Sequence, residues 1–499
     1  MTGSSTSNGT VQVGRRLEAA GTHERAGQPA EAMREALAAL DLHSDCAEAK
    51  SLITRVLRYY PGSAPAERRD VLSRLLVDPV VEPAVIARAA WHLLLVEGQP
   101  LAAYASDPAG LAQWAERDEL AIRLLEESPV TVLEAERALT RMRRWLLLSR
   151  RWPDFPRLLA GLTAQTAWNG GAWLIELDER KLVDAESENP MAAAYFASPP
   201  ASDAAAEFGD PVTGTVAAQY EDWPYPAWSR ITPPPPQTLP EMVERLDQGQ
   251  PSGLPVAANL LVAGCGTGRE AALWALRLPD ACITAIDLSA ASLAYARERC
   301  RALGIDRIHF RQLDLHKVGE LGRTFDFISS SGVLHHLPDP EGGWEALTAV
   351  LKPGGAMRIM LYSKIARLKV RAAQRHLADL AGRPADADLL REARRRLIER
   401  APDLLASWID FYTLPGVHDL LLHRHEDSFD VPRIGRALER LGLELLAFDL
   451  PTLHHRARYL REHPHDPAFR DLKAWAALER REPFLFQSMY SFHCRKAGG

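Results

Sequence analysis

The sequence predicts a two-part protein in which an α-helical N-terminal region precedes an α/β domain with a mostly parallel sheet. Three features predict this fold class. A glycine-rich loop, Gly264-Cys-Gly-Thr-Gly268, follows the apolar run 259–263 directly. Apolar runs and helical stretches then alternate regularly, which favours parallel strands joined by right-handed crossovers. The earlier region is dominated by Ala, Leu, Glu and Arg, which are typical of helices.

The N-terminal region divides into a tail and a helical part. Residues 1–14 are rich in Ser, Thr and Gly and are predicted to be a disordered tail and not a secretory signal, because they have neither the basic nor the apolar segment of such a signal. Residues 15–184 are predicted to be helical. The unit 15–48 resembles a TPR repeat but has no clean second copy, so a degenerate helical repeat and a plain bundle both stay open. Either form would offer a surface for a protein partner or for self-association.

Residues 185–240 are predicted to be a linker with an aromatic segment. Prolines are frequent in this range, and Pro233–Pro236 must be extended. The α/β domain is placed at 241–499. The aromatic segment that precedes it contains Tyr220, Trp223, Tyr225 and Trp228. A fragment that begins near Pro211 is expected to fold by itself, because it carries its own sheet and core.

The glycine loop and the acid that follows it predict a nucleoside site. Gly264, Gly266 and Gly268 allow a sharp turn and a close backbone approach, and the next helix would present free N–H groups to a ligand. Asp287 ends the next apolar run, 19 residues after Gly268, where a carboxylate can accept hydrogen bonds from ribose hydroxyls. The G-x-G-x-G spacing is one residue shorter than the dinucleotide fingerprint, so it suits a ligand with one nucleoside and no pyrophosphate.

With these features and three further motifs, residues 210–499 resemble the class I S-adenosyl-L-methionine (SAM) methyltransferases. The motifs are Gln312-Leu-Asp-Leu315, Phe325-Asp-Phe-Ile-Ser-Ser-Ser-Gly-Val-Leu-His-His336 and Leu351-Lys-Pro-Gly-Gly355. The resemblance implies SAM as the cofactor and a Rossmann-like, seven-stranded sheet whose last strand is inserted antiparallel. Strands are expected at 259–263, 282–287, 307–313, 325–330, 356–362, 443–449 and 484–495. The segments 219–226 and 357–363 further resemble bacterial proteins that append this domain to TPR-like helices.

The resemblance also implies which residues bind the cofactor. The glycines would line the methionine part, Asp287 would bind the ribose, and Asp314 would contact the adenine unless it only caps a turn. The aromatic segment would either cover the cofactor, where rings attract the sulfonium cation, or pack the linker onto the domain. The full predicted set is Gly264, Cys265, Gly266, Gly268, Asp287, Leu288, Asp314, Leu315, Ser330 and Ser331.

Two adjacent histidines and one tyrosine are the candidate catalytic residues. A base is needed only if the acceptor carries a proton that it cannot lose unaided, and His335 or His336 would supply one near neutral pH. One of the two histidines is expected to be structural. Tyr362, at the end of the fifth expected strand, would face the methyl group. No Asn-Pro-Pro-Tyr or Asp-Pro-Pro-Tyr motif follows the fourth strand, which argues against methylation of planar amide and adenine nitrogens.

A long segment, 364–440, separates the fifth and sixth expected strands and is rich in arginine. It would either be a cap that binds an acidic acceptor, with Tyr412 lining the acceptor pocket, or a solvated helical insertion with intrahelical ion pairs. Seven histidines between His418 and His465 match no metal motif, so no metal is expected.

The composition excludes several classes of function. The net charge is −6, which gives no electrostatic case for nucleic acid, and no apolar run is long enough to span a membrane. The five cysteines form no C-x-x-C pair, and a cytoplasmic protein is the simplest interpretation. We predict methyl transfer from SAM to an O, S or aliphatic N acceptor of a small molecule or a protein or peptide. The alternative is a non-catalytic SAM-binding adaptor whose helical region recruits a partner; a dinucleotide oxidoreductase is disfavoured by the short loop.

Overall fold

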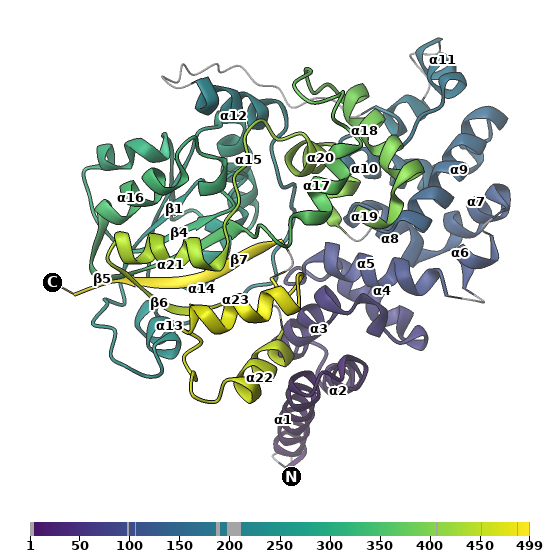
Figure 1. The fold of residues 1–499 in the computed structure, drawn as a ribbon. Coiled ribbons are helices and arrows are strands. Elements are labelled where there is room, and N and C mark those ends of the chain that lie inside the picture. The colour runs from purple at the N-terminus through teal and green to yellow at the C-terminus, as the bar shows by residue number, and fades with distance from the viewer. Residues whose placement is uncertain are drawn as a thin grey trace.

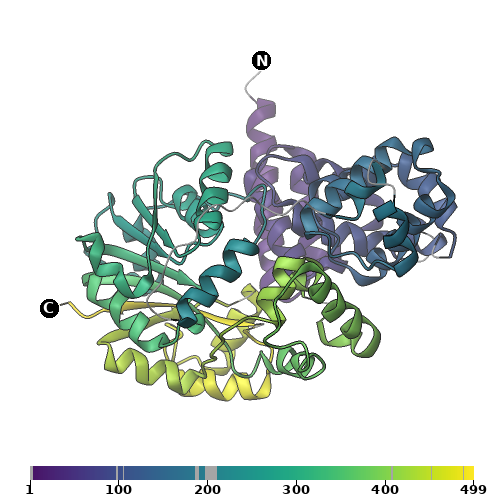
Figure 2. The same ribbon diagram turned by 90° about the horizontal axis from the view of Figure 1, so that it is seen from above.

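The computed structural model describes residues 4–96, 99–104, 106–185, 190–196, 211–405, 408–450, 452–486 and 488–498. A helical lobe and a lobe built around one sheet lie side by side (Figure 1). Helices inserted after the fifth strand of the sheet lie between the two lobes (Figure 2).

The helical lobe is a series of short helices packed on one apolar core. Proline in the first turn begins many of them, because its fixed φ suits that turn and its missing N–H is not needed there. The carboxylates of Asp107 and Asp118 cap two of the helices. The helices are α1 (Ser4–Arg25), α2 (Pro29–Leu42), α3 (Ala47–Tyr59), α4 (Arg69–Val77), α5 (Pro83–Leu94), α6 (Pro100–Ala103), α7 (Pro108–Arg117), α8 (Glu119–Glu127), α9 (Leu133–Ser149), α10 (Pro156–Asn169) and α11 (Leu177–Ala185).

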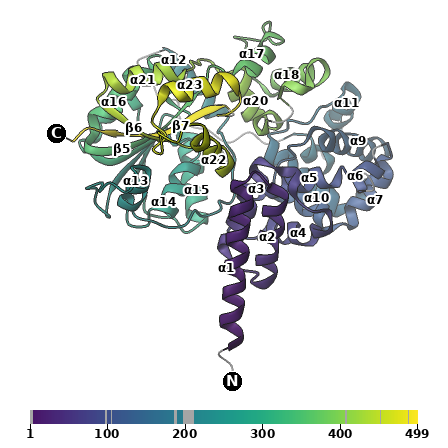
Figure 3. The same ribbon diagram turned by 60° about the horizontal axis from the view of Figure 1, so that its bottom comes forward.

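Two boundaries of this lobe differ from the sequence prediction. The predicted disordered tail is helical from Ser4 onward, as the first part of α1, which projects from the lobe (Figure 3). Val13 and Leu17 pack against the core, and a helix that is anchored in this way extends at little further cost. At the other end the lobe continues beyond 184, because the short helix Pro190–Ala194 and Tyr195 are buried in the same core.

The sheet has seven strands in the order β3-β2-β1-β4-β5-β7-β6, which confirms the predicted fold class. The first five strands are parallel, and β7 is inserted antiparallel between β5 and β6. The strands are β1 (Asn259–Ala263), β2 (Cys282–Asp287), β3 (Ile308–Gln312), β4 (Phe325–Ser331), β5 (Leu351–Tyr362), β6 (Leu443–Phe448) and β7 (Met489–Lys496).

Helices cover both faces of the sheet. The core on one face includes residues of α13 (Leu239–Leu246), α14 (Arg269–Arg277) and α15 (Ala290–Ala302). The core on the other face includes residues of α16 (Pro340–Val350), α21 (Val431–Arg440) and α23 (Leu472–Arg481). A further helix, α22 (Leu453–Glu462), contacts α1 of the helical lobe. The carboxyl ends of the parallel strands stay open to a ligand at one edge.

The insertion is shorter than predicted and closes on itself. Its ends meet where Lys364 N–H donates to the Phe429 carbonyl at 2.8 Å and Phe429 N–H donates to the Tyr362 carbonyl at 2.9 Å. The predicted range reached 440, but α21 packs on the sheet through Val431, Ile434 and Leu438 and therefore belongs to the domain core. The inserted helices are α17 (Leu368–Arg375), α18 (Ala387–Arg400), α19 (Pro402–Leu405), a short 3-10 helix (Ile409–Tyr412) and α20 (Leu414–Leu421).

The predicted linker is ordered where it is described, and its part from Pro211 onward packs on the sheet lobe. Its helix α12 (Pro211–Asp222) contacts α15, and the Glu221 carboxylate accepts from Ala291 N–H at the start of that helix. Trp228 is buried beside the glycine loop, where its indole N–H donates to the Thr267 carbonyl at 2.9 Å. Residues 186–189 and 197–210 of the predicted linker lie outside the described residues.

Candidate active site

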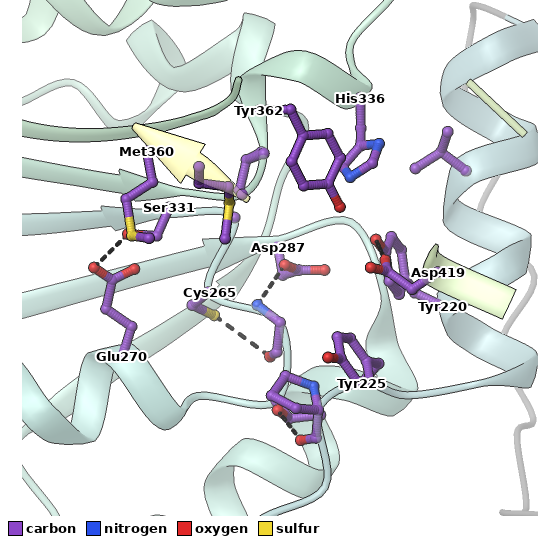
Figure 4. A pocket seen from close by; sticks show the side chains of 18 of the residues that line it. Tyr220, Tyr225, Cys265, Glu270, Asp287, Ser331, His336, Met360, Tyr362 and Asp419 are labelled. Carbon is purple, nitrogen blue, oxygen red and sulfur yellow. Dashed lines mark hydrogen bonds between the residues drawn. The ribbon is translucent and has the colours of Figure 1, made fainter. Parts of the chain in front are cut away.

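A cavity of about 500 Å³ lies at the carboxyl ends of β1, β2, β4 and β5. This volume is typical of sites for small ligands. Three parts of the chain enclose the cavity: the edge of the sheet, the aromatic segment and the insertion (Figure 4). Seven of the ten predicted cofactor-binding residues line it: Gly264, Cys265, Gly266, Asp287, Leu288, Leu315 and Ser331. Two of the three predicted catalytic residues, His336 and Tyr362, line it as well.

The glycine loop forms one wall of this cavity and requires glycine at its turns. Gly264, Gly266 and Gly268 all have positive φ, at 73°, 51° and 81°. A Cβ on Gly264 would lie 2.3 Å from a methyl group of Val333, and one on Gly268 would lie 2.5 Å from the Cβ of Ala296. Gly264 and Gly266 face the cavity, whereas Gly268 does not line it and instead precedes α14. The predicted strand, turn and helix are therefore present, and Gly268 serves the turn.

Asp287 lies at the end of β2, as predicted, and its carboxylate faces the cavity. One oxygen accepts from Gly266 N–H at 2.7 Å and the other accepts from Ser289 N–H at 2.9 Å. Burial raises the pKa of Asp287, and the backbone donors oppose that shift. The carboxylate is thus fixed against the glycine loop and keeps lone pairs for ribose hydroxyls.

Besides Gly268, two further predicted cofactor residues lie away from the cavity lining. Asp314 caps the helical turn after β3, where its carboxylate accepts from His316 N–H at 2.9 Å. This is the capping role that the sequence left open. Ser330 is fully buried within β4 and does not line the cavity. Its neighbour Ser331 donates to Glu270 at 2.7 Å, and Arg358 pairs with the same Glu270 oxygen at 2.9 Å.

The two histidines have different positions. His335 is fully buried, its Nδ1 accepts from Tyr362 N–H at 3.1 Å, and its ring stacks on Tyr362 with 3.7 Å between ring centroids. His336 lines the cavity, and its Nδ1 lies 2.9 Å from the His425 carbonyl. Because a carbonyl only accepts, Nδ1 carries the proton and Nε2 of the neutral ring has a free lone pair. His335 therefore packs behind Tyr362, and of the two rings only His336 lines the cavity.

Buried charges next to the histidines come from the insertion. Burial lowers the pKa of His336, while the nearby Asp419 carboxylate opposes that shift. Arg367 lies over the Tyr362 ring at 4.0 Å and pairs with Glu426. Asp410, Asp419, Arg367 and Trp408 all line the cavity, and none was predicted as a site residue. No local motif marks them, since only the fold of the insertion brings them to the edge of the sheet.

Several basic residues of the insertion are already paired. Arg395 and Arg396 bind Glu392, Glu399 and Asp379. Arg394 is fully buried and binds Glu136 of the helical lobe. Tyr412, expected to line the acceptor pocket, is instead buried in the core that the insertion shares with the helical lobe. These pairs account for much of the basic character that suggested an acidic acceptor.

Three side chains are close enough to share a cation: His336, Asp419 and His423, whose ligand atoms lie within 4.8 Å of one another. The hydrogen bonds of His423 oppose this role. Its Nδ1 accepts from His425 N–H at 3.1 Å, so neutral His423 carries its proton on Nε2, which lies 3.3 Å from the Tyr220 hydroxyl. That hydroxyl donates to Asp419 at 2.6 Å. The cluster therefore forms a hydrogen-bonded network, in which only His336 keeps a free nitrogen lone pair.

A second cavity, of about 740 Å³, lies between the helical lobe and the sheet lobe. Arg58, Glu82, Glu127 and Trp168 line it from the helical lobe. Glu82 binds both Arg58, at 2.6 Å, and Arg269 at the start of α14, at 2.8 Å. The two cavities share several lining residues: Tyr225, Pro226, Arg269, Trp408, Asp410 and Ser488. The helical lobe thus borders a space that adjoins the candidate active site.

Comparison with protein families matches residues 260–355 to a family model described as a methyltransferase domain. The matched range contains the glycine loop, Asp287 and both candidate histidines. No helix in the described part of the chain has both the length and the apolar character needed to cross a membrane.

Curated relatives match parts of the chain. An uncharacterized protein of Synechococcus is 35% identical over 286 residues, which cover 54% of this chain and 65% of that protein. Trans-aconitate 2-methyltransferase of Deinococcus radiodurans is 35% identical over 104 residues, covering 21% of this chain and 38% of that enzyme. The chain therefore spans less than two thirds of the length of these relatives. Among solved structures, PKMT2 from Rickettsia typhi in complex with AdoHcy aligns with a TM-score of 0.40 and 15% identity, over 53% of this chain and 54% of that one.

Proposed function

We propose that this chain, which carries a class I SAM-dependent methyltransferase domain, transfers the methyl group of SAM to an O, S or aliphatic N atom of an acceptor. The observation that carries the proposal is one cavity that joins the glycine loop and Asp287 to His336 and Tyr362. A cofactor-binding half and a half with a free base thus face each other (Figure 4).

The residues at the sheet edge fit the cofactor. We propose that Asp287 binds the ribose hydroxyls, that Leu288 and Leu315 contact the adenine, and that Gly264 and Gly266 approach the methionine part. The backbone at Gly266 is open to the ligand, because the only heavy atom of the described chain within 4 Å of a Cβ position there, its two chain neighbours aside, is the Tyr225 carbonyl oxygen, at 3.3 Å. When bound, SAM supplies a methyl group on a positively charged sulfur that leaves with the bonding electron pair.

The remaining residues handle the acceptor. Alignment of the acceptor and exclusion of water supply most of the rate of a displacement reaction. His336 Nε2 is placed to take the proton that the acceptor loses as its new bond to carbon forms. Stacking on His335 and the guanidinium of Arg367 hold Tyr362 in place beside that base.

We propose that the helical lobe forms part of the acceptor site. Its residues line the cavity that shares Tyr225, Trp408 and Asp410 with the candidate active site. An acceptor larger than the reacting group would extend into this space. If the helical lobe only bound a partner protein, it would have no reason to lie next to the cavity that contains His336 and Tyr362.

The experiment is a methyl-labelling assay with tritiated SAM, the full chain and a bacterial extract separated into protein and small-molecule fractions. We expect label in one fraction with the wild type, and strong loss with His336→Asn. A non-catalytic adaptor would bind SAM, and neither fraction would become labelled. His376→Asn is the matched control, because His376 is exposed on the insertion.

A further inference from the structure

Two carboxylates of the insertion face the candidate active site without a basic partner. Asp410 lies in the short helix Ile409–Tyr412 and Asp419 in α20, and both line the cavity. Among the described residues, neither carboxylate forms an ion pair with lysine or arginine. Their hydrogen-bond donors are tyrosines of the aromatic segment: Tyr225 donates to Asp410, and Tyr220 donates to Asp419 at 2.6 Å.

Three other carboxylates that are buried or partly buried have an arginine or backbone N–H partners. Glu136 pairs with Arg394, Glu426 pairs with Arg367, and Asp287 accepts from two backbone N–H groups. A carboxylate that is removed from water without a basic partner destabilises the folded chain, so proteins seldom keep one without a use. Burial raises the pKa of Asp410 to about 6; the hydrogen bond from Tyr225 opposes this shift, the nearby Asp419 adds to it, and the more distant charge of Arg367 lowers it only in part. Two such carboxylates next to each other create a site that a cation would stabilise.

The surrounding groups fit a positively charged nitrogen. Tyr220, Tyr225 and Tyr362 surround the same space as Asp419 (Figure 4). Aromatic rings and carboxylates together are the groups that recognise ammonium ions in proteins. His336 and Asp419 also have ligand atoms within 4.8 Å of each other. A nitrogen held by Asp419 would therefore be close to the free lone pair of the base.

We propose that the acceptor is an aliphatic amine, bound as an ammonium ion by Asp410 and Asp419 and methylated on nitrogen. This inference rests on the proposed function. The ammonium gives one proton to His336 Nε2, and the freed lone pair forms the bond to the methyl carbon. The electron pair of the broken carbon–sulfur bond stays on sulfur, and the proton on His336 passes to solvent.

The position of the two carboxylates assigns them to the acceptor and not to the cofactor. Asp410 also lines the cavity between the lobes, whereas Asp287, Leu288 and the glycine loop from Gly264 to Gly266 do not. Both carboxylates come from the insertion, outside the 260–355 range that matches the methyltransferase model. An amine entering from the cavity between the lobes would meet Asp410 first.

The test uses the full chain, tritiated SAM and a bacterial extract in two forms. One form is untreated. In the other, the amines are acetylated with sulfo-NHS-acetate, and the excess reagent is hydrolysed before the assay. Acetylation removes the charge and lone pair of amines on small molecules and proteins alike. We expect methyl transfer to the untreated extract and at least a tenfold lower transfer after acetylation. The incorporated label should not be released as methanol by alkali. Undiminished transfer after acetylation, or label released by alkali, overturns the amine proposal. If no methyl group is transferred to the untreated extract, the proposed function is overturned, and this inference with it.

Substitutions separate the acceptor from the cofactor. Asp410→Asn and Asp419→Asn are expected to lower transfer at least tenfold and to leave the Kd for SAM within about twofold, measured by calorimetry on the folded variants. Asp403→Asn is the matched control, because Asp403 is exposed in the same insertion, and it should change neither value. Loss of SAM binding in both active-site variants would assign the carboxylates to the cofactor and overturn the proposal.

Discussion

Arg394 of the insertion and Glu136 of the helical lobe form a buried, bidentate ion pair with nitrogen–oxygen distances of 2.9 and 2.8 Å. The same guanidinium donates to the carbonyls of Phe411 and Ala172. Leu133 and Ala172 of the helical lobe also belong to the apolar core of the insertion. The insertion, which supplies part of the candidate active site, is thus folded against the helical lobe.

Breaking this ion pair should destabilise the protein strongly. Glu136→Gln leaves Arg394 charged and buried without its partner, which costs about 3 kcal/mol by analogy with other buried pairs. Urea unfolding followed by circular dichroism measures this loss. Glu134→Gln, an exposed position on the same helix, is the control and should change the free energy of unfolding by less than about 0.5 kcal/mol. Equal effects of the two substitutions would contradict the structural role of the pair.

A fragment that begins at Pro211 should be less stable than the sequence alone suggests. Without the helical lobe, it would expose Arg394 and the apolar side chains that pack against Leu133 and Ala172. We expect the fragment to aggregate or to bind the apolar dye ANS, and to regain solubility when produced together with residues 1–196. A soluble, dye-negative fragment would show that the sheet lobe and insertion fold independently.

The candidate base predicts a pH dependence of turnover. Burial lowers the pKa of His336, so the neutral, proton-accepting ring is present above a value that lies below the ordinary 6.5. The kcat should therefore rise as pH increases toward that value and level off above it. His336→Asn should lower kcat by about 10²–10⁴-fold and remove this dependence, with little change in SAM affinity. An unchanged pH profile in the variant would rule out His336 as the base.

Asp410 is expected to lower the free energy of unfolding at neutral pH. Its folded-state pKa of about 6 lies above the ordinary 3.8, so ionisation is less favourable in the folded chain. The penalty is absent below about pH 4, grows as pH rises, and is complete above about pH 6. Asp410→Asn should therefore raise the melting temperature by a few degrees at pH 7.5 and leave it almost unchanged at pH 4. A variant that is less stable at pH 7.5 would contradict the view that the Tyr225 hydrogen bond does not offset the burial of this carboxylate.

The sheet and the cofactor half of the site could be predicted because their signals are local. Apolar strands, glycines that need positive φ and an acid at the end of a strand lie close together in the sequence. The predicted last strand began too early, at 484, because Leu485 and Phe486 precede the strand, which begins at Met489, and pack in the core.

The acceptor half could not be predicted because its contacts are distant in the sequence. Arg394 looked like one of several basic residues, and its burial depends on Glu136, 258 residues away. Two adjacent histidines look alike in sequence, and only the fold buries His335 behind Tyr362 and leaves His336 facing the cavity. Asp410 and Asp419 carry no motif, and their partners are Tyr225 and Tyr220 of a separate segment.

The most direct test of the account is the binding of SAM by isothermal titration calorimetry. We predict one site per chain in the wild type and a loss of about 1.5–3 kcal/mol of binding free energy in Asp287→Ala, as expected for hydrogen bonds to a charged group. Asp314→Ala is the matched control, because Asp314 caps a turn outside the cavity, and it should bind SAM nearly as tightly as the wild type. Unchanged SAM affinity in a folded Asp287→Ala variant, or no binding by the wild type, would contradict the central claim that this cavity is a SAM site.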